Sequence, residues 1–148
     1  MAKITEALEN NELILLDGGI STEIQQRGVS MDSEAWSALA ARTHPDVVQA
    51  VHEDYIRAGA QIITANTYST ARHVLESIGC GDETRAINTE AVRVATAARD
   101  NAATGPTWIA GSMSSFPPFN SSHDITTSTA CLLYTSDAAD DTPCVDLG

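Results

Sequence analysis

Residues 13–16 are four consecutive large aliphatic side chains, and the run ends abruptly at Asp17, Gly18 and Gly19. It lacks the alternation of polar and apolar residues that a half-exposed strand shows, so it is typical of a strand covered on both faces in a parallel sheet. The two glycines widen the range of backbone angles and let a ligand approach the main chain closely. We therefore predict a buried strand at about residues 12–17, with the Asp17 carboxylate at its carboxyl end.

Parallel α/β folds build their sites at the carboxyl ends of strands, which makes Asp17 a candidate site residue. A second interpretation stays open. Asp-Gly is also a common turn pair, and on that interpretation Asp17 only caps the segment that follows.

Two further strands are predicted, at about residues 61–66 and 107–111, and helical patterns separate the three strands. The helix over 43–59 carries its apolar residues at helical spacing and ends at a glycine; they are Val47, Val48, Val51, Tyr55 and Ala58. A second long helix, over about 82–102, has a predicted buried stripe of Ile87, Ala91, Val94 and Ala98. Shorter helices are expected over about 2–10, 20–28 and 69–78. Helices between strands predict a parallel sheet with right-handed crossovers.

Two histidines fall within the helix over 43–59, His44 and His52. Neither has a second metal ligand at suitable spacing on the same helix face. We therefore interpret both as surface or capping residues.

Polar residues mark the carboxyl end of each predicted strand: Asp17, then Asn66 and Thr67, then Ser112. This repeated placement is what a pocket at the top of a (β/α)8 barrel requires. A flavodoxin-like or Rossmann sheet is also compatible with it. However, no G-x-G-x-x-G follows the first strand and no P-loop lysine is present, so the sequence gives little support to nucleotide binding.

The C-terminal stretch has a different character. Residues 131–148 resemble a translated sequencing adapter, and we interpret them as a non-native tail that follows a partial domain over residues 1–130. The tail holds four of the 20 acidic residues and no Lys or Arg, so leaving it out changes the formal net charge from −12 to −8. A balance this acidic argues against a nucleic-acid surface.

Outside that tail the sequence contains one cysteine, Cys80, which fits a reducing compartment and cannot form an internal disulfide. No run approaches the ~20 apolar residues of a membrane helix, and residues 1–11 lack the apolar core of a signal peptide. We expect a cytoplasmic protein that binds neither nucleic acid nor membranes.

At several of these motifs the sequence resembles the homocysteine S-methyltransferase family. The motifs are LDGGIST at 16–22, WS at 36–37, HPD at 44–46, AGAQIITANTY at 58–68 and AGS at 110–112. Together they cover about residues 12–118, in the order and spacing of the family's N-terminal portion. The first and fourth motifs in combination are the most specific part of the match.

The resemblance implies the N-terminal part of a (β/α)8 barrel whose complete form methylates the thiol of homocysteine to give methionine. It also implies a zinc ion, because coordination to Zn²⁺ deprotonates a thiol and makes it a nucleophile for the methyl donor. The family holds zinc with cysteines on later strands. No residue of this sequence matches those positions, so we assign neither metal ligands nor catalytic residues here.

On the substrate side the resemblance carries over residue by residue. It implies that Asp17 holds the homocysteine ammonium and that the backbone at Gly18 and Gly19 meets the polar end of the substrate. It places Trp36 on the pocket wall, and Asn66 and Thr67 at the end of the second strand. Two alternatives stay open: Trp36 as a core residue, and Asn66 as a tie for a loop. The partners expected are small molecules, homocysteine and a methyl donor that the sequence does not identify.

The sequence is compatible with two other functional classes. An aspartate-nucleophile phosphatase also begins with an aliphatic strand ending in Asp, but that chemistry needs a second Asp two positions later, where Gly19 stands. The other is a truncated reading frame without activity, and we expect the 148 residues alone to be inactive.

Three strands leave two open sheet edges, so Leu13, Leu15, Ile62 and Ile109 are expected to meet water.

Overall fold

The computed structural model describes residues 4–32 and 34–112, and within them the chain has an α/β fold. The α-helices are α1 (Ile4–Glu9), α2 (Ile20–Gln26), α3 (Ala40–Thr43), α4 (Pro45–Arg57), α5 (Arg72–Ser77) and α6 (Thr84–Ala102). A short 3-10 helix, η1 (Gly81–Glu83), leads into α6, and the strands are β1 (Ile62–Thr64) and β2 (Trp108–Ala110). The predicted boundary at residue 130 and the tail over 131–148 lie outside the described residues. No helix in the described ranges is long and apolar enough to cross a membrane.

The two strands pair in parallel, with Ile62 opposite Trp108 and Thr64 opposite Ala110. The segment before α2 lies on the other side of β1 and is also parallel to it, through a single bridge between Leu16 and Ile62. There the amide of Asp17 donates to the Ile62 carbonyl at 2.9 Å. The three segments are therefore neighbours in the order of the chain, which confirms the predicted parallel pairing.

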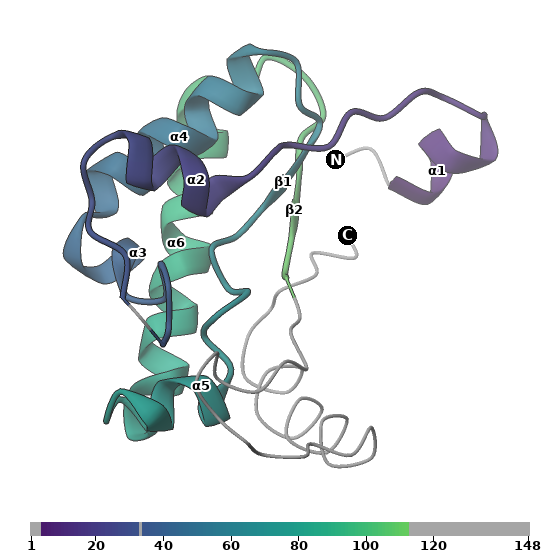
Figure 1. Cartoon of the computed structure of the whole chain (residues 1–148). Coiled ribbons are helices and arrows are strands. Elements are labelled where there is room, and N and C mark those ends of the chain that lie inside the picture. The colour runs from purple at the N-terminus through teal and green to yellow at the C-terminus, as the bar shows by residue number, and fades with distance from the viewer. Residues whose placement is uncertain (1–3, 33, 113–148) are drawn as a thin grey trace.

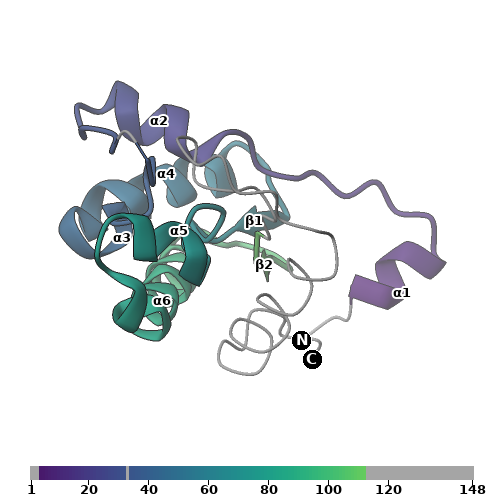
Figure 2. The ribbon, with the colours of Figure 1, turned by 60° about the horizontal axis from the view of Figure 1, so that its bottom comes forward.

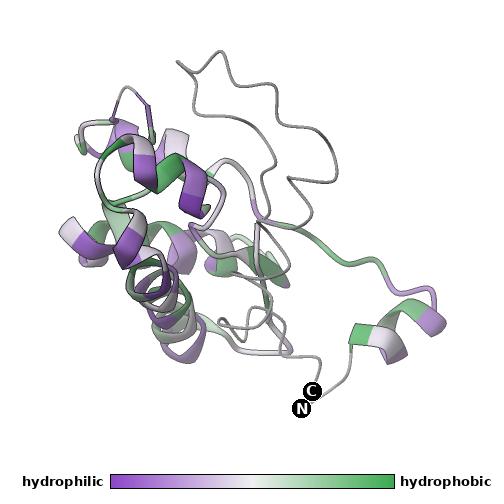
Figure 3. Ribbon diagram, turned by 90° about the horizontal axis from the view of Figure 1, so that it is seen from below, coloured by the Kyte–Doolittle hydropathy of each residue, from purple (hydrophilic) through white to green (hydrophobic). Residues whose placement is uncertain are grey.

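The prediction of a buried strand at residues 12–17 is wrong. Only one bridge forms, and Leu13, Leu15 and Leu16 are 83, 48 and 66% exposed. The physical reason is that β1 pairs with one side of this segment, while no other described element covers its faces. Figure 3 shows the hydrophobic run between α1 and the sheet in the open. The expected contact with water is thus observed for Leu13 and Leu15, whereas Ile62 and Ile109 are half-buried.

Helices α2 to α6 gather on one side of the two strands, and α1 lies apart from them beyond the exposed segment (Figures 1 and 2). The core lies between these helices and the strands. On α6 the predicted stripe is confirmed: Ile87, Ala91, Val94 and Ala98 are all fully buried. Because alanine occupies half of that stripe, α4 can pack closely on α6, and these two helices make the most extensive contact among the described elements.

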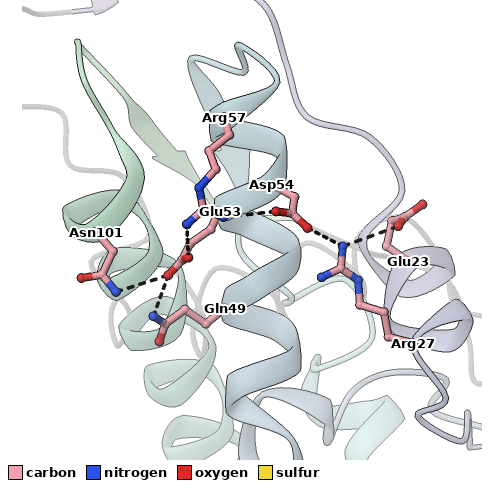
Figure 4. Close-up of polar contacts among 7 residues, drawn as sticks. All are labelled: Glu23, Arg27, Gln49, Glu53, Asp54, Arg57 and Asn101. Atoms are coloured by element: carbon pink, nitrogen blue, oxygen red, sulfur yellow. Dashed lines mark hydrogen bonds and ion pairs between the residues drawn. The ribbon is translucent and has the colours of Figure 1, made fainter.

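Polar contacts on the surface join the same helices (Figure 4). Arg27, just after α2, donates to Asp54 of α4 at 2.8 Å. On the other side of α4, Glu53 accepts from Asn101 of α6 at 3.2 Å and pairs with Arg57 at 2.6 Å. Since most of these groups are solvent-exposed, these ion pairs contribute little to stability.

The interpretation of His52 as a surface or capping residue is wrong. His52 lies one turn after Val48 on the buried face of α4 and is fully buried, whereas His44 is exposed as expected. Neither ring nitrogen of His52 has a hydrogen-bond partner among the described residues. Desolvation disfavours the charged imidazolium and lowers the pKa of His52 to about 4.

Candidate functional site

A cavity of about 360 Å³ lies at the carboxyl ends of the parallel segments. Its walls are residues 16–22, Trp36, residues 64–66, Tyr68 and Ser112. The carboxyl ends of parallel strands meet at one edge of a sheet, which explains why segments so far apart in sequence share one cavity. Five of the six predicted site residues line the cavity: Asp17, Gly18, Gly19, Trp36 and Asn66.

The Asp17 carboxylate is held against β1. One of its oxygens accepts from the main-chain N–H of Thr64 at 2.7 Å, and the other accepts from the Thr64 hydroxyl at 2.9 Å. Partial burial raises the pKa of Asp17, and the two bonds from Thr64 oppose that shift. Asp17 is therefore fixed in orientation, and each of its oxygens keeps a lone pair that Thr64 does not use.

Gly18 is required by a close approach from α4. A Cβ atom at this position would lie 2.8 Å from the Tyr55 hydroxyl oxygen and 3.1 Å from the nearest ring carbon. At Gly19, by contrast, a Cβ atom would meet only Thr22, at an ordinary 3.5 Å. The absence of a side chain at Gly18 thus lets Tyr55 pack directly beneath the backbone of the cavity wall.

Trp36 lies in the cavity wall and not in the core, since 46% of it is exposed. Its backbone adopts φ = 55°, a left-handed conformation that is rare for a bulky residue and marks strain that the surroundings must offset. Those surroundings include Asp32, whose backbone exchanges two hydrogen bonds with that of Trp36, at 2.8 and 3.2 Å. The Asp32 side chain also accepts from the amides of Glu34 and Ala35.

Asn66 and Thr67 hold neighbouring segments together. The Asn66 side chain donates to the Ser37 carbonyl at 2.8 Å and accepts from the Ser37 hydroxyl at 3.0 Å. The interpretation of Asn66 as a tie for a loop thus describes its contacts. The Thr67 hydroxyl accepts from the amide of Ser112 at 2.9 Å and lies at 3.0 Å from its carbonyl oxygen, which joins the ends of β1 and β2. Thr67 is buried beside the cavity and is not one of the side chains in its wall.

Three residues of this region were missed by the sequence reasoning: Ser21, Thr64 and Tyr55. Thr64 lies two positions before Asn66, so alternation along a strand would have placed both on one face. Tyr55 was assigned only to the apolar stripe of its helix. Nothing in the sequence pattern distinguishes Ser21 from other small polar residues after a strand.

A metal site is not found in the described ranges 4–32 and 34–112. No three side chains among their His, Cys, Asp and Glu residues come together as a metal-binding group. Cys80 is a free, half-buried thiol between α5 and η1 and is not in the cavity wall. The residues described here therefore do not fit the zinc ion that the family resemblance implies.

Comparison with known proteins agrees with the fold and the motifs. A profile of the family described as Homocysteine S-methyltransferase matches residues 14–144. Homocysteine S-methyltransferase 2 of Arabidopsis thaliana is 33% identical over 88 residues, which cover 59% of this chain and 26% of the relative. Homocysteine S-methyltransferase of Escherichia coli (strain K12) is 30% identical over 112 residues, covering 72% of this chain and 36% of the relative.

Solved structures give the same result. The oxidized form of the homocysteine methyltransferase MmuM from Escherichia coli superposes with a TM-score of 0.64 at 28% identity, over 72% of this chain and 40% of that one. Its metallated form has a TM-score of 0.65 at 24% identity, over 89% and 53%, and this second likeness concerns the fold alone. The chain spans about a quarter to a third of the length of the curated relatives described here. From the profile match over most of its length, the chain belongs to the homocysteine S-methyltransferase family.

Proposed function

We propose that the cavity binds the amino-acid end of homocysteine, and that the whole protein transfers a methyl group to the homocysteine thiol. Family membership supports the reaction class, and the relatives' names give homocysteine as the acceptor. The observation that carries the proposal is that Thr64 holds the Asp17 carboxylate in the wall of the cavity. A carboxylate with free lone pairs is suited to an ammonium group, because charge-assisted hydrogen bonds are the stronger ones.

The other predicted residues take supporting roles in this proposal. Gly18 and Gly19 bring the main chain close to the polar end of the substrate, since neither carries a side chain into the cavity. Trp36 forms an aromatic wall. Asn66 and Thr67 hold the loop and the strand ends from which that wall is built.

We further propose that the chain forms the N-terminal part of a (β/α)8 barrel. Parallel neighbours in chain order and helices gathered on one side of the strands support this, as does the likeness to MmuM. In a barrel the exposed residues Leu13, Leu15 and Leu16 would be covered by elements that the described residues do not provide.

Activation of the thiol is assigned to groups outside residues 4–32 and 34–112. The resemblance implies zinc for this step, and one of the similar solved structures is described as metallated. Because the described residues bring together no metal-binding group, we derive no step of the reaction through a metal. We propose instead that the 148 residues bind homocysteine without transferring a methyl group to it.

The phosphatase alternative is not favoured. Both oxygens of Asp17 accept hydrogen bonds from Thr64, and Gly19 occupies the position where that chemistry needs a second carboxylate. Because that second carboxylate is missing, the Asp17 carboxylate is better suited to binding a cation than to phosphatase chemistry.

Calorimetric titration of the chain with reduced L-homocysteine tests the proposal. We expect Asp17→Asn to weaken binding at least tenfold, because the ammonium loses its counter-charge. Asp100→Asn is the matched control: Asp100 is an exposed α6 carboxylate, paired only with its neighbour Arg99 in the described structure, and its loss should leave binding unchanged. Equal affinity of the Asp17→Asn variant and the unmodified chain would reject Asp17 as the ammonium site.

A further inference from the structure

A line of three polar side chains runs from the cavity wall into the interior: Ser21, Ser37 and Asn66. The hydroxyl oxygens of Ser21 and Ser37 are 2.6 Å apart. The Ser37 hydroxyl is in turn 3.0 Å from the amide oxygen of Asn66. Ser37 and Asn66 are only 3 and 6% exposed, while Ser21 is half-buried and lines the cavity.

The main chain fixes the direction of every hydrogen bond in this line. The carbonyl oxygen of Ser37 can only accept, and it lies 2.8 Å from one terminal atom of the Asn66 amide. That atom must therefore be the nitrogen, so the oxygen of the amide faces the Ser37 hydroxyl. An amide oxygen can only accept, which commits the single hydroxyl proton of Ser37 to Asn66.

This commitment determines the role of Ser21. Since the proton of Ser37 is already used, the short contact between the two hydroxyls requires Ser21 to donate its own proton to Ser37. The oxygen of Ser21 then has no proton left to offer and keeps a lone pair. Because Ser21 lines the cavity, it presents to a ligand a hydrogen-bond acceptor and not a donor.

We propose that Ser21 is a further binding residue of the cavity, whose oxygen accepts a hydrogen bond from the substrate's ammonium group beside Asp17. Ser37 and Asn66 are positioning residues that set this polarity. The inference rests on the proposed function, because it takes the amino-acid end of homocysteine as the ligand. Its chemical basis is that an ammonium carries three N–H donors, while Thr64 already occupies one lone pair on each oxygen of Asp17.

The test compares two ligands that differ only in the ammonium: L-homocysteine and 4-sulfanylbutanoate, each titrated calorimetrically into the full chain. We expect Ser21→Ala to raise the Kd of L-homocysteine about tenfold, the change that follows from losing one hydrogen bond to a charged group. The Kd of 4-sulfanylbutanoate should stay within twofold. Ser21→Thr keeps the hydroxyl and should restore the affinity for L-homocysteine.

Two more variants separate positioning from general structural damage. Ser37→Ala removes the acceptor for the Ser21 proton, so the Ser21 oxygen is no longer held as an acceptor, and only the binding of L-homocysteine should weaken. Ser77→Ala is the matched control, because the Ser77 hydroxyl donates to the Val74 carbonyl in α5 and is not in the cavity wall. It should change neither affinity.

The outcomes separate this inference from the function on which it rests. If the unmodified chain binds L-homocysteine and Ser21→Ala binds it equally well, the role of Ser21 is overturned while the proposed function stands. An equal loss for both ligands in Ser21→Ala also overturns it, because the effect would then not involve the ammonium. Failure of the unmodified chain to bind L-homocysteine overturns the proposed function and this inference together.

Discussion

Thr64 donates two hydrogen bonds to Asp17, one from its main-chain N–H at 2.7 Å and one from its hydroxyl at 2.9 Å. The two residues are 47 positions apart in sequence, and the contact joins the exposed N-terminal segment to the end of β1. A carboxylate bound at both oxygens has little freedom to rotate. Asp17 therefore meets a ligand in a defined orientation, which reduces the ordering cost of binding.

Thr64→Val should raise the pKa of Asp17 further. The hydrogen bond from the Thr64 hydroxyl favours the ionised carboxylate, and the variant removes this bond. The partial burial that already raises the pKa of Asp17 remains. NMR titration of the carboxyl carbon measures the pKa directly. Thr64→Ser should restore the original value, and Thr96→Val is the matched control, since the Thr96 hydroxyl donates to the Val92 carbonyl within α6. A pKa of Asp17 that is the same in Thr64→Val would contradict the assigned role of the hydroxyl.

Gly18→Ala should destabilise the chain by about 1–3 kcal/mol, because the new methyl group overlaps the Tyr55 hydroxyl and ring. Urea denaturation gives the change in the free energy of unfolding. Gly19→Ala is the matched control next to it, where the nearest atom is at van der Waals distance. Equal stabilities of the two variants would show that Tyr55 does not pack beneath Gly18.

His52 should make the chain less stable as the pH decreases. The folded-state pKa of His52 is about 4, below its ordinary value of 6.5, so between these values the unfolded chain binds a proton that the folded chain does not. This contribution to stability is present above pH 6.5 and is lost as the pH falls toward 4. At pH 5 the loss amounts to about 2 kcal/mol relative to pH 7.

His52→Leu should remove that part of the pH dependence, because leucine cannot take up a proton in either state. The comparison requires urea denaturation of both proteins at pH 7 and pH 5, since the carboxylates titrate in both and cancel in the difference. If His52→Leu loses as much stability between pH 7 and pH 5 as the unmodified chain does, His52 does not contribute to the pH dependence.

Substitutions of Leu13 and Ile63 compare the burial of the exposed segment with that of the core. Leu13→Ala should change the free energy of unfolding by no more than about 0.5 kcal/mol, because Leu13 is 83% exposed. Ile63→Ala should cost about 2–5 kcal/mol, because Ile63 is fully buried in β1. Urea denaturation measures both. A large loss in Leu13→Ala would show that the segment is covered in solution.

Helical periodicity predicted the part of the fold that depends on local pattern. The stripe of α6 was placed correctly because Ile87, Ala91, Val94 and Ala98 recur at helical spacing and need no knowledge of a distant partner. The burial of His52 was missed because the absence of a second metal ligand was taken to place it at the surface. Its position four residues after Val48 carried the correct signal, since residues so spaced share a helix face.

Features that depend on distant partners were less predictable. The run at residues 13–16 has the pattern of a buried strand, but burial needs covering elements, and those are not among the described residues. The meeting of Asp17 and Asn66 at one cavity followed from their predicted places at strand ends, and the place of Trp36 in its wall followed from the resemblance to a family. The bonds of Thr64 to Asp17 and of Ser37 to Asn66 required the three-dimensional structure, because no sequence spacing encodes them.

We propose that Asp17 receives the ammonium of homocysteine. The most direct measurement is the pKa of Asp17, followed by NMR at its carboxyl carbon in the free chain and with saturating reduced L-homocysteine. We expect the pKa of Asp17 to lie above its ordinary value in the free chain and to decrease clearly with L-homocysteine, because a nearby positive charge favours the ionised form. 4-Sulfanylbutanoate, which lacks the ammonium, should cause no decrease. A pKa of Asp17 that stays the same when L-homocysteine is bound would show that Asp17 does not receive the ammonium.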